Sequence, residues 1–413
     1  MPERMTDSVP DVSDVTAVPV VPDGPRERDA SGEPRGARPS GRSRTIRAVV
    51  QTGPRTLEVR EFPRPVTGPD DGLLRVEANG ICGSDVEIYR GHLHGRSAAP
   101  FIPGHEPLGI IEELGERAAE RWGVQVGDRV ALEVIIPCRS CADCLVGRYQ
   151  ACRNRQGGHG VTPVDVEPSL HGGFAEYLYL APNAVMHKVD RRLPIDIAAM
   201  YNPLGAGVRW AVDLGEVGLG DTLVVLGAGQ RGLAAVMAAK AAGARTVIIT
   251  GLESDRHKLA VAEELGADHA IVVDGPEGRD IVEAVTEITG GRMADVSLDL
   301  TPMAAGPVTD ALNVVRHGGR VVLAGLKGGR EIPLDTDLVI NRGLTVRGAF
   351  GVDAAANEKA IALLESGRFP LERLHTHTFG LDQVAEAIET LAGEREDTSA
   401  IHVTVQPHLG RTP

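Results

Sequence analysis

Four of the five cysteines lie within one short stretch of the chain. They are Cys138, Cys141, Cys144 and Cys152, with two, two and seven residues between them. Four thiolates in one loop are enough to close a tetrahedral zinc shell without water, and a closed shell has no position for a substrate. We therefore predict a structural zinc site. The alternative is a redox or nucleic-acid-binding zinc module, and the formal charge of −14 argues against nucleic acid.

A second group of possible metal ligands precedes this loop. Cys82 stands in the run Gly80–Asp85, which reads G-I-C-G-S-D, and His105 and Glu106 follow it 23 residues later. A buried cysteine or a hydrogen-bonded surface histidine is the simpler interpretation of each residue alone. Thiolate, imidazole and carboxylate together are zinc ligands, and three protein ligands with an open fourth position are typical of a catalytic site.

A glycine-rich motif indicates a dinucleotide site. It follows the apolar run Leu223–Leu226 directly and precedes the helix-forming run Leu233–Ala242. In such a motif the first glycine permits a tight turn, the second lets a pyrophosphate approach, and the third lets helix and strand pack closely. An ordinary glycine-rich turn is the alternative, and the strand and helix on either side favour the dinucleotide. The candidate cofactor-binding residues here are Gly227, Gly229, Gln230, Arg231 and Gly232.

The choice between NAD and NADP depends on the next strand and its loop. An acidic residue about 20 positions further on usually binds the ribose of NAD, but Gly251 stands there. Without that carboxylate a 2′-phosphate is not repelled, and Arg256 lies close by, which favours NADP. Glu253 and Asp255 lie in the same loop, and either could instead serve the ribose of NAD.

The elements that must position these residues fall into two patterns. From residue 47 short Val- and Ile-rich runs are broken by Gly and Pro, which indicates β-structure. Between residues 222 and 325 apolar strands alternate with amphipathic helices, the pattern of a doubly wound parallel sheet. After Leu344 we expect a strand, two helices near 358–365 and 381–391, and a closing strand at 402–405 that returns to the first domain.

Composition limits the classes of protein and partner. The 413 residues contain 43 Lys and Arg against 57 Asp and Glu, so we expect no nucleic-acid or membrane partner. No apolar run reaches about 18 residues and no secretory signal pattern is present, so we expect a soluble cytoplasmic protein. Residues 1–44 are rich in Pro and mixed charge, which predicts a disordered tail, and we expect residues 407–413 to fray.

Four motifs follow one another along the chain: G-I-C-G-S-D at 80–85, G-H-E at 104–106, the four-cysteine loop and the glycine-rich motif. Together and in this order they resemble the zinc-dependent medium-chain alcohol and polyol dehydrogenases. The resemblance covers residues 45 to 406. It implies an α/β Rossmann domain, a doubly wound parallel sheet, inserted in a GroES-like β-rich catalytic domain. The implied boundaries are 45–204 for the catalytic domain, 205–343 for the Rossmann domain, and 344–406 for a segment that completes both. It also implies a homodimer or a homotetramer.

The resemblance assigns roles to single residues. It makes Cys82, His105 and Glu106 ligands of a catalytic zinc ion, and the four cysteines of the loop ligands of a structural zinc ion. The chain would then bind two zinc ions. Ser84 would pass the proton of the alcohol onward. Asp85 would be the carboxylate that orients the ligating imidazole.

Two residues depart from the family pattern. Asn202 stands before Pro-Leu, where relatives usually carry Glu, Cys or Asp as a ligand. A neutral amide is a poor zinc ligand but can hydrogen-bond a water on the metal. Glu87 stands where many relatives have a histidine of the proton relay, and it either accepts a proton or is a solvated charge.

The predicted function is hydride transfer between a nicotinamide cofactor, NAD(P), and an alcohol and its ketone, with a secondary alcohol or polyol as substrate. One alternative is a zinc-free quinone or enoyl reductase of the same superfamily, against which the cysteines argue. Another is a catalytically inactive nucleotide-binding regulator, supported only by Asn202 and Glu87.

Overall fold

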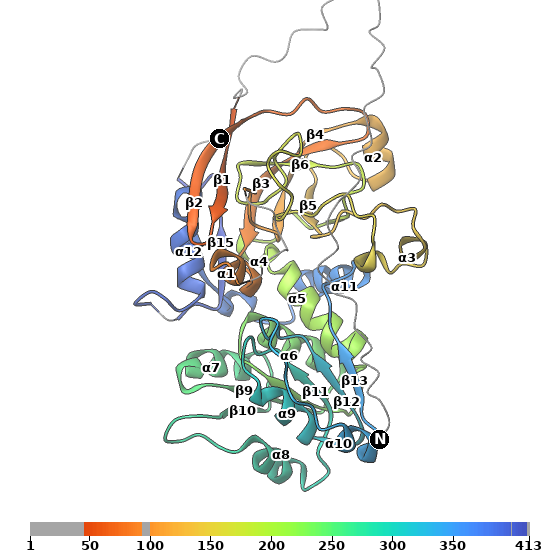
Figure 1. The fold of residues 1–413 in the computed structure, drawn as a ribbon, viewed down its shortest axis with the longest axis vertical. Coiled ribbons are helices and arrows are strands. Elements are labelled where there is room, and N and C mark those ends of the chain that lie inside the picture. Colours follow the sequence, from red (N-terminus) through yellow and green to blue (C-terminus); the bar gives the residue numbers. More distant parts are fainter. Residues whose placement is uncertain (1–44, 93–99, 398, 411–413) are drawn as a thin grey trace, which may run out of the picture. The chain divides into compact units, whose positions relative to one another are not determined.

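The computed structural model describes residues 45–92, 100–397 and 399–410. The predicted tail at 1–44 and the last three residues of the predicted C-terminal tail lie outside these ranges. Most of the described strands form two separate sheets, one mainly antiparallel and one parallel (Figure 1).

The first sheet is built from segments far apart in the sequence. Its order is β14-β15-β3-β4-β5-β7, with β6 on β3, and a separate antiparallel pair is formed by β1 and β2. β15 pairs antiparallel with β3, and α12 packs on α1, so the C-terminal segment closes onto the N-terminal strands (Figure 1). The strands are β1 (Thr45–Gly53), β2 (Thr56–Pro63), β3 (Gly72–Gly80), β4 (Pro107–Leu114), β5 (Arg129–Leu132), β6 (Tyr177–Leu180), β7 (Met186–Lys188), β14 (His375–Phe379) and β15 (His402–Val405).

The second sheet is parallel, as the alternation of strands and helices predicts. Its order is β10-β9-β8-β11-β12-β13: β9 and β10 are added on one side of β8, and β11, β12 and β13 are added on the other side, all parallel to it. β8 is buried at every position, as expected for a central parallel strand covered on both faces. The strands are β8 (Thr222–Leu226), β9 (Thr246–Gly251), β10 (His269–Val272), β11 (Ala294–Asp299), β12 (Val315–Leu323) and β13 (Thr345–Gly348).

Helices connect the strands and cover the sheets. The α-helices are α1 (Gly83–Tyr89), α2 (Glu116–Trp122), α3 (Ala142–Leu145), α4 (Ile195–Ala198), α5 (Tyr201–Gly207), α6 (Gln230–Ala242), α7 (Arg256–Glu264), α8 (Ile281–Thr289), α9 (Gly306–Asn313), α10 (Thr336–Arg342), α11 (Ala354–Glu365) and α12 (Val384–Leu391). Short 3₁₀ turns are η1 (Tyr149–Ala151), η3 (Glu253–Asp255), η4 (Leu371–Arg373) and η5 (Leu381–Gln383). α5 runs on into a π-helical segment, η2 (Val208–Leu214).

The connection between the two sheets runs through α5. Its Tyr201 hydroxyl donates to the carbonyl of Leu132 at the end of β5, 2.7 Å away, while the helix also packs on α6 of the parallel sheet. The predicted boundary between 204 and 205 therefore falls inside this helix. The last predicted segment begins with β13, which belongs to the parallel sheet, and continues with β14 and β15 of the other.

Several element limits differ from the sequence prediction. The apolar run Val321–Ala324 predicts a strand that starts at Val321, but β12 begins six residues earlier, at Val315, because it already pairs there with Ala294 of β11. The expected fraying near the C-terminus is wrong for His408, whose ring contacts Tyr177 edge-on at 6.0 Å. In the part of the chain that the structure describes, no helix is long and apolar enough to cross a membrane.

Candidate metal and cofactor sites

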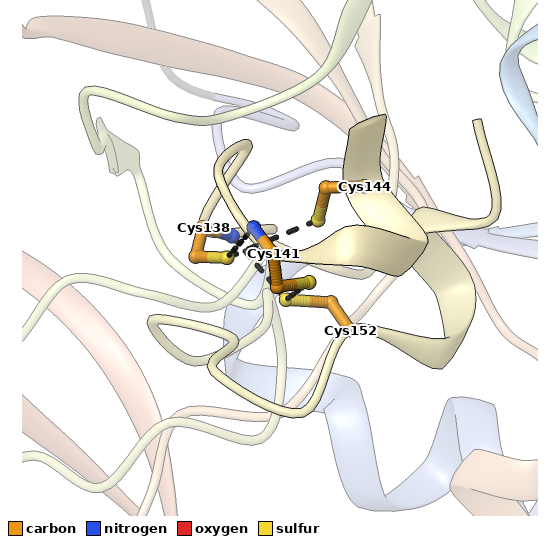
Figure 2. A group of neighbouring side chains, drawn as sticks. All are labelled: Cys138, Cys141, Cys144 and Cys152. Atoms are coloured by element: carbon orange, nitrogen blue, oxygen red, sulfur yellow. Dashed lines mark hydrogen bonds between the residues drawn. The ribbon is translucent and has the colours of Figure 1, made fainter. Parts of the chain in front are cut away.

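The four cysteines of the loop between β5 and β6 converge on one point (Figure 2). Their sulfur atoms all lie within 4.8 Å of one another, and the Cys138–Cys144 and Cys141–Cys152 pairs are each 3.9 Å apart. Four sulfurs at about 2.3 Å from a tetrahedral zinc ion would be about 3.8 Å apart. The cluster therefore fits a closed zinc shell, and none of the four forms a disulfide.

Hydrogen-bond donors from the neighbouring chain point at one of these sulfurs. The backbone N–H of Cys141 donates to Sγ of Cys138 at 3.3 Å, and the pKa of the Cys138 thiol falls to about 6, chiefly because of hydrogen bonds from Ser140. Burial and the neighbouring thiols raise the pKa of Cys144 to about 12. Four ionised thiols crowd one another, and a divalent cation is the group that would hold all four as thiolates.

The second predicted ligand group also converges. Ligand atoms of Cys82, His105 and Glu106 lie within 4.8 Å of one another, and all three residues are buried. Cys82 is the N-cap of α1, where its sulfur accepts the N–H of Ser84, and the other two residues directly precede β4. These soft and borderline donors suit zinc, and a set of three leaves a position for substrate.

Asp85 ties two of these ligands together. Its Oδ2 accepts the backbone N–H of Cys82 at 2.9 Å, and its Oδ1 lies 3.0 Å from Nδ1 of His105. Burial alone would lower the pKa of His105, but the Asp85 carboxylate and Cys82 raise it well above its usual value. The contact leaves Nε2 of His105 on the side of the ligands, where Ser84 Oγ lies 3.3 Å from it and 3.1 Å from Cys82 Sγ.

Glu106 is fully buried and has a cationic partner on α6, a helix that covers the parallel sheet. Its Oε1 accepts from Nη2 of Arg231 at 3.1 Å and lies 4.0 Å from Nε2 of His105. The same nitrogen of Arg231 donates to Oδ1 of Asn202 at 3.2 Å. Burial raises the pKa of Glu106, while Arg231 and His105 oppose that rise. Asn202 thus joins the site through Arg231.

Glu87 is occupied elsewhere. Its carboxylate binds Nη1 of Arg90 at 2.9 Å and Nδ1 of His92 at 2.7 Å. These contacts describe an ion pair at the end of α1, and a role in the proton relay stays a prediction.

The glycine motif has the form that a pyrophosphate requires. Gly227 has φ of +110°, and a Cβ on Gly232 would lie 2.0 Å from the carbonyl oxygen of Gly227. A Cβ on Gly229 would meet nothing within 4 Å, so the N-terminus of α6 faces open space. This is the arrangement in which free backbone N–H groups bind phosphate. Gln230 links the motif to the catalytic side by donating to the carbonyl of Ile81 at 3.0 Å.

The loop after β9 carries more ion pairs than its sequence reveals. Arg256 binds Glu253 through Nε at 2.5 Å and is also paired with Glu277. Asp255 pairs with Lys258 at 2.8 Å. The NADP candidate Arg256 is therefore already neutralised in part, although its side chain remains 47% exposed.

One polar group near the cofactor motif was missed by the sequence prediction. Lys327 lies 2.7 Å from the buried Asp299 and donates to the carbonyl of Thr301 at 2.6 Å. Thr301 in turn lies against Gly227. Asp299 is the last residue of β11, Thr301 follows that strand, and Lys327 follows β12, so all three lie at the carboxyl ends of strands, where ligands bind in doubly wound sheets. That position, directly after two predicted strands, was the available signal.

A parallel doubly wound sheet carrying a dinucleotide motif, joined to a β-rich domain with two zinc-type ligand groups, defines a metal-dependent nicotinamide dehydrogenase. The family comparisons agree. The alcohol dehydrogenase GroES-like domain matches residues 68–191, and the zinc-binding dehydrogenase domain matches residues 232–366. The chain belongs to the zinc-dependent medium-chain dehydrogenase/reductase family.

Individual relatives extend over nearly the whole chain. A protein of Mycobacterium tuberculosis described as a "probable alcohol dehydrogenase" is 45% identical over 369 residues, 88% of this chain and 98% of the relative. An erythritol/L-threitol dehydrogenase of Mycolicibacterium smegmatis is 34% identical, over 85% of this chain and 95% of the relative. The chain is therefore an oxidoreductase that acts on alcohols.

Solved structures confirm the predicted fold class. An alcohol dehydrogenase of Thermotoga maritima superposes with a TM-score of 0.78 at 25% identity, over 88% of this chain and 99% of the other. An Escherichia coli alcohol dehydrogenase in complex with NADH superposes with a TM-score of 0.75 at 26% identity, over 88% of this chain and 100% of the other. A Sinorhizobium meliloti structure bound to NADP, provisionally assigned as a zinc-binding dehydrogenase, gives 0.76 at 28% identity, over 88% and 99%. Zinc and a nicotinamide cofactor belong to this protein's chemistry.

Proposed function

We propose that the protein transfers a hydride between NAD(P) and a secondary alcohol or polyol at a zinc ion held by Cys82, His105 and Glu106. The observation that carries the proposal is the convergence of these three buried side chains within 4.8 Å. They lie where Gln230 and Arg231 of the dinucleotide motif reach the catalytic side. A second zinc ion, held by the four-cysteine loop, would be structural.

In this mechanism the protein orients the metal ligands and accepts the proton of the substrate alcohol. Bound zinc supplies a Lewis acid, and the nicotinamide ring accepts or donates the hydride. Asp85 fixes the His105 ring by its Nδ1, so that Nε2 faces the ligand position. Ser84 Oγ, 3.1 Å from Cys82 Sγ and partly exposed, is the hydroxyl placed to accept the proton of the substrate alcohol while its own proton passes to solvent.

Cofactor choice and assembly are part of the proposal. Gly251 lacks the carboxylate that selects NAD, and the exposed Arg256 supports NADP as the preferred cofactor. A homodimer or homotetramer is supported by β13, which ends the parallel sheet with an unpaired side in the described chain. Ile340 and Phe350, on either side of this strand in the sequence, are 73% and 55% exposed.

A panel of alcohols assayed with NAD and NADP separately, together with metal analysis, tests the function. We expect two zinc ions per chain, and NADP-linked oxidation of secondary alcohols or polyols at least as fast as with NAD. Cys82→Ser should lose one zinc ion and the activity while keeping the fold. Active protein that contains no zinc would instead support the zinc-free reductase, and zinc-loaded protein inactive on every alcohol would support the regulator.

A further inference from the structure

Arg231 has an unusual position for a residue of a dinucleotide motif. It belongs to the first turn of α6, whose N-terminus faces the phosphate position, yet its guanidinium crosses to the metal ligands. There one nitrogen, Nη2, donates both to Glu106 Oε1 and to Asn202 Oδ1. The guanidinium also lies over the ring of Trp210, 5.3 Å from its centre, in the π-helical segment η2.

The oxygen that Arg231 holds is the one that faces the other metal ligands. Glu106 Oε1 lies 4.0 Å from His105 Nε2 and 3.1 Å from Arg231, whereas Oε2 is buried without a hydrogen-bond partner among the described residues. A metal ion bound by Cys82, His105 and Glu106 would therefore share this one carboxylate with Arg231. Two cations on one carboxylate at such distances repel each other and compete for its charge.

Asn202 makes this arrangement unbalanced. It is a neutral amide that lies against the same guanidinium and adds no negative charge. The charges at the site are thus those of the buried Cys82, Asp85 and Glu106 against that of Arg231, whose side chain is 27% exposed, and that of a bound metal ion. Arg231 removes part of the negative charge that would otherwise hold the metal.

We propose that Arg231 is a positioning residue of the metal site, which holds Glu106 by Oε1 and keeps the metal ion exchangeable. The proposal rests on zinc binding by Cys82, His105 and Glu106. It predicts that removal of Arg231 changes the rate of metal loss in the direction opposite to that expected for a merely structural ion pair. If Arg231 only supported the fold of the site, its removal would loosen the ligands and speed metal loss; if it competes for Glu106, its removal tightens the site.

The test measures metal release rather than turnover. Zinc release from the holoenzyme to a colorimetric chelator is followed in wild type, Arg231→Met and Arg231→Lys, with melting temperatures recorded in parallel. We expect release from the catalytic site to slow at least tenfold in Arg231→Met and to stay within about threefold of wild type in Arg231→Lys, which keeps the charge. Arg373→Met, which breaks an exposed pair with Glu264, is the matched control and should change nothing.

A double-mutant cycle identifies the partner. In a Glu106→Gln background the added Arg231→Met should slow release much less than it does in wild type, because the charge for which Arg231 competes is gone and only its direct repulsion of the metal ion remains. Replacement of zinc by cobalt(II) gives a second readout, since the thiolate absorption band should shift in Arg231→Met if the Glu106 oxygen moves onto the metal. Release from Arg231→Met that is as fast as or faster than wild type overturns the proposal.

A different result would show that the underlying assignment of the zinc site is wrong. If Cys82→Ser retains the same zinc content as wild type, the Cys82 site holds no zinc, and the proposed function falls together with this inference. If Cys82→Ser loses one zinc ion while Arg231→Met leaves release unchanged, only the role of Arg231 is wrong.

Discussion

At the scale of single residues, Asp85 contacts two of the proposed metal ligands at once. One oxygen fixes the backbone of Cys82 and the other fixes the ring of His105. A carboxylate is needed for the second task because it stabilises the orientation and basicity of a ligating imidazole. An amide of the same shape keeps one hydrogen bond but loses the charge.

Asp85→Asn is therefore expected to weaken zinc binding at the catalytic site by about 10–100-fold, the usual effect of removing such a partner. The melting temperature should change far less. Competition with a chelator of known affinity measures the change, and Asp70→Asn, at a surface pair with Arg117, serves as the control. An affinity equal to that of wild type would show that Asp85 only caps α1.

We expect the selectivity between NADP and NAD to depend on Arg256. Its exposed guanidinium is the cation placed to bind a 2′-phosphate, although it already contacts Glu253 and Glu277. Arg256→Ala should weaken NADP binding by about tenfold, equivalent to about 1.4 kcal/mol, and leave NAD binding nearly unchanged. Glu277→Gln should strengthen NADP binding because it frees the guanidinium.

Fluorescence titration with both cofactors checks these affinities. Equal losses for NAD and NADP in Arg256→Ala would exclude a phosphate contact. The reverse substitution, Gly251→Asp, is a less direct test, because a Cβ there would lie 3.0 Å from Asp255 Cβ and 3.2 Å from Ala228 Cβ.

At the scale of elements, the loop of the four cysteines buries little apolar surface, although hydrogen bonds of Arg139 and Tyr149 tie it to neighbouring segments. Its helices are short: α3 has four residues and η1 has three, and neither buries a side chain fully. Leu145 and Val146 are 73% and 65% exposed. We therefore expect a loop with so little apolar burial to depend on a metal ion bound by its four thiols to remain ordered.

Cys144→Ser should therefore lower the melting temperature. A loss of about 3 kcal/mol in the free energy of unfolding corresponds to a decrease of about 6–12 °C in the melting temperature of a domain of about 150–250 residues. Differential scanning calorimetry, with zinc content measured on the same sample, checks the change. Ser140→Ala, which keeps all four thiols, is the control. A variant that loses the zinc ion but melts at the wild-type temperature would contradict a structural role.

Sequence reasoning succeeds for elements whose residues are close together along the chain. The glycine motif, its strand and its helix are contiguous, so spacing and local conformation are enough to predict them. It fails where side chains meet across the two sheets. Nothing in the G-A-G-Q-R-G motif indicates that Arg231 contacts Glu106, which lies 125 residues earlier. That contact depends on how α5 and α6 pack and on the path of the π-helical segment.

At the scale of the whole molecule, the C-terminal segment joins both sheets and brings a buried histidine with it. His402, on β15, is 1% exposed, and its Nε2 has no hydrogen-bond partner among the described residues. Its Nδ1 lies 3.2 Å from Nδ1 of His375. Burial, with a smaller contribution from His375, lowers the pKa of His402 to about 3. The folded protein therefore holds this ring neutral where the unfolded chain would protonate it.

The sign of the pH effect follows from linkage. Between about pH 3 and the unfolded value near 6.5, the unfolded chain binds one more proton at His402, so the free energy of unfolding falls as the pH falls through this window. The slope for one such histidine is about 1.4 kcal/mol per pH unit. His402→Gln removes the titrating group, so its melting temperature should depend less on pH between 7 and 5, even if it melts lower than wild type at pH 7. Melting curves at several pH values check this, with the exposed His317→Gln as a control that should keep the wild-type dependence. The same pH dependence in His402→Gln and wild type would mean that His402 is protonated in the folded protein or that β15 opens before the rest unfolds.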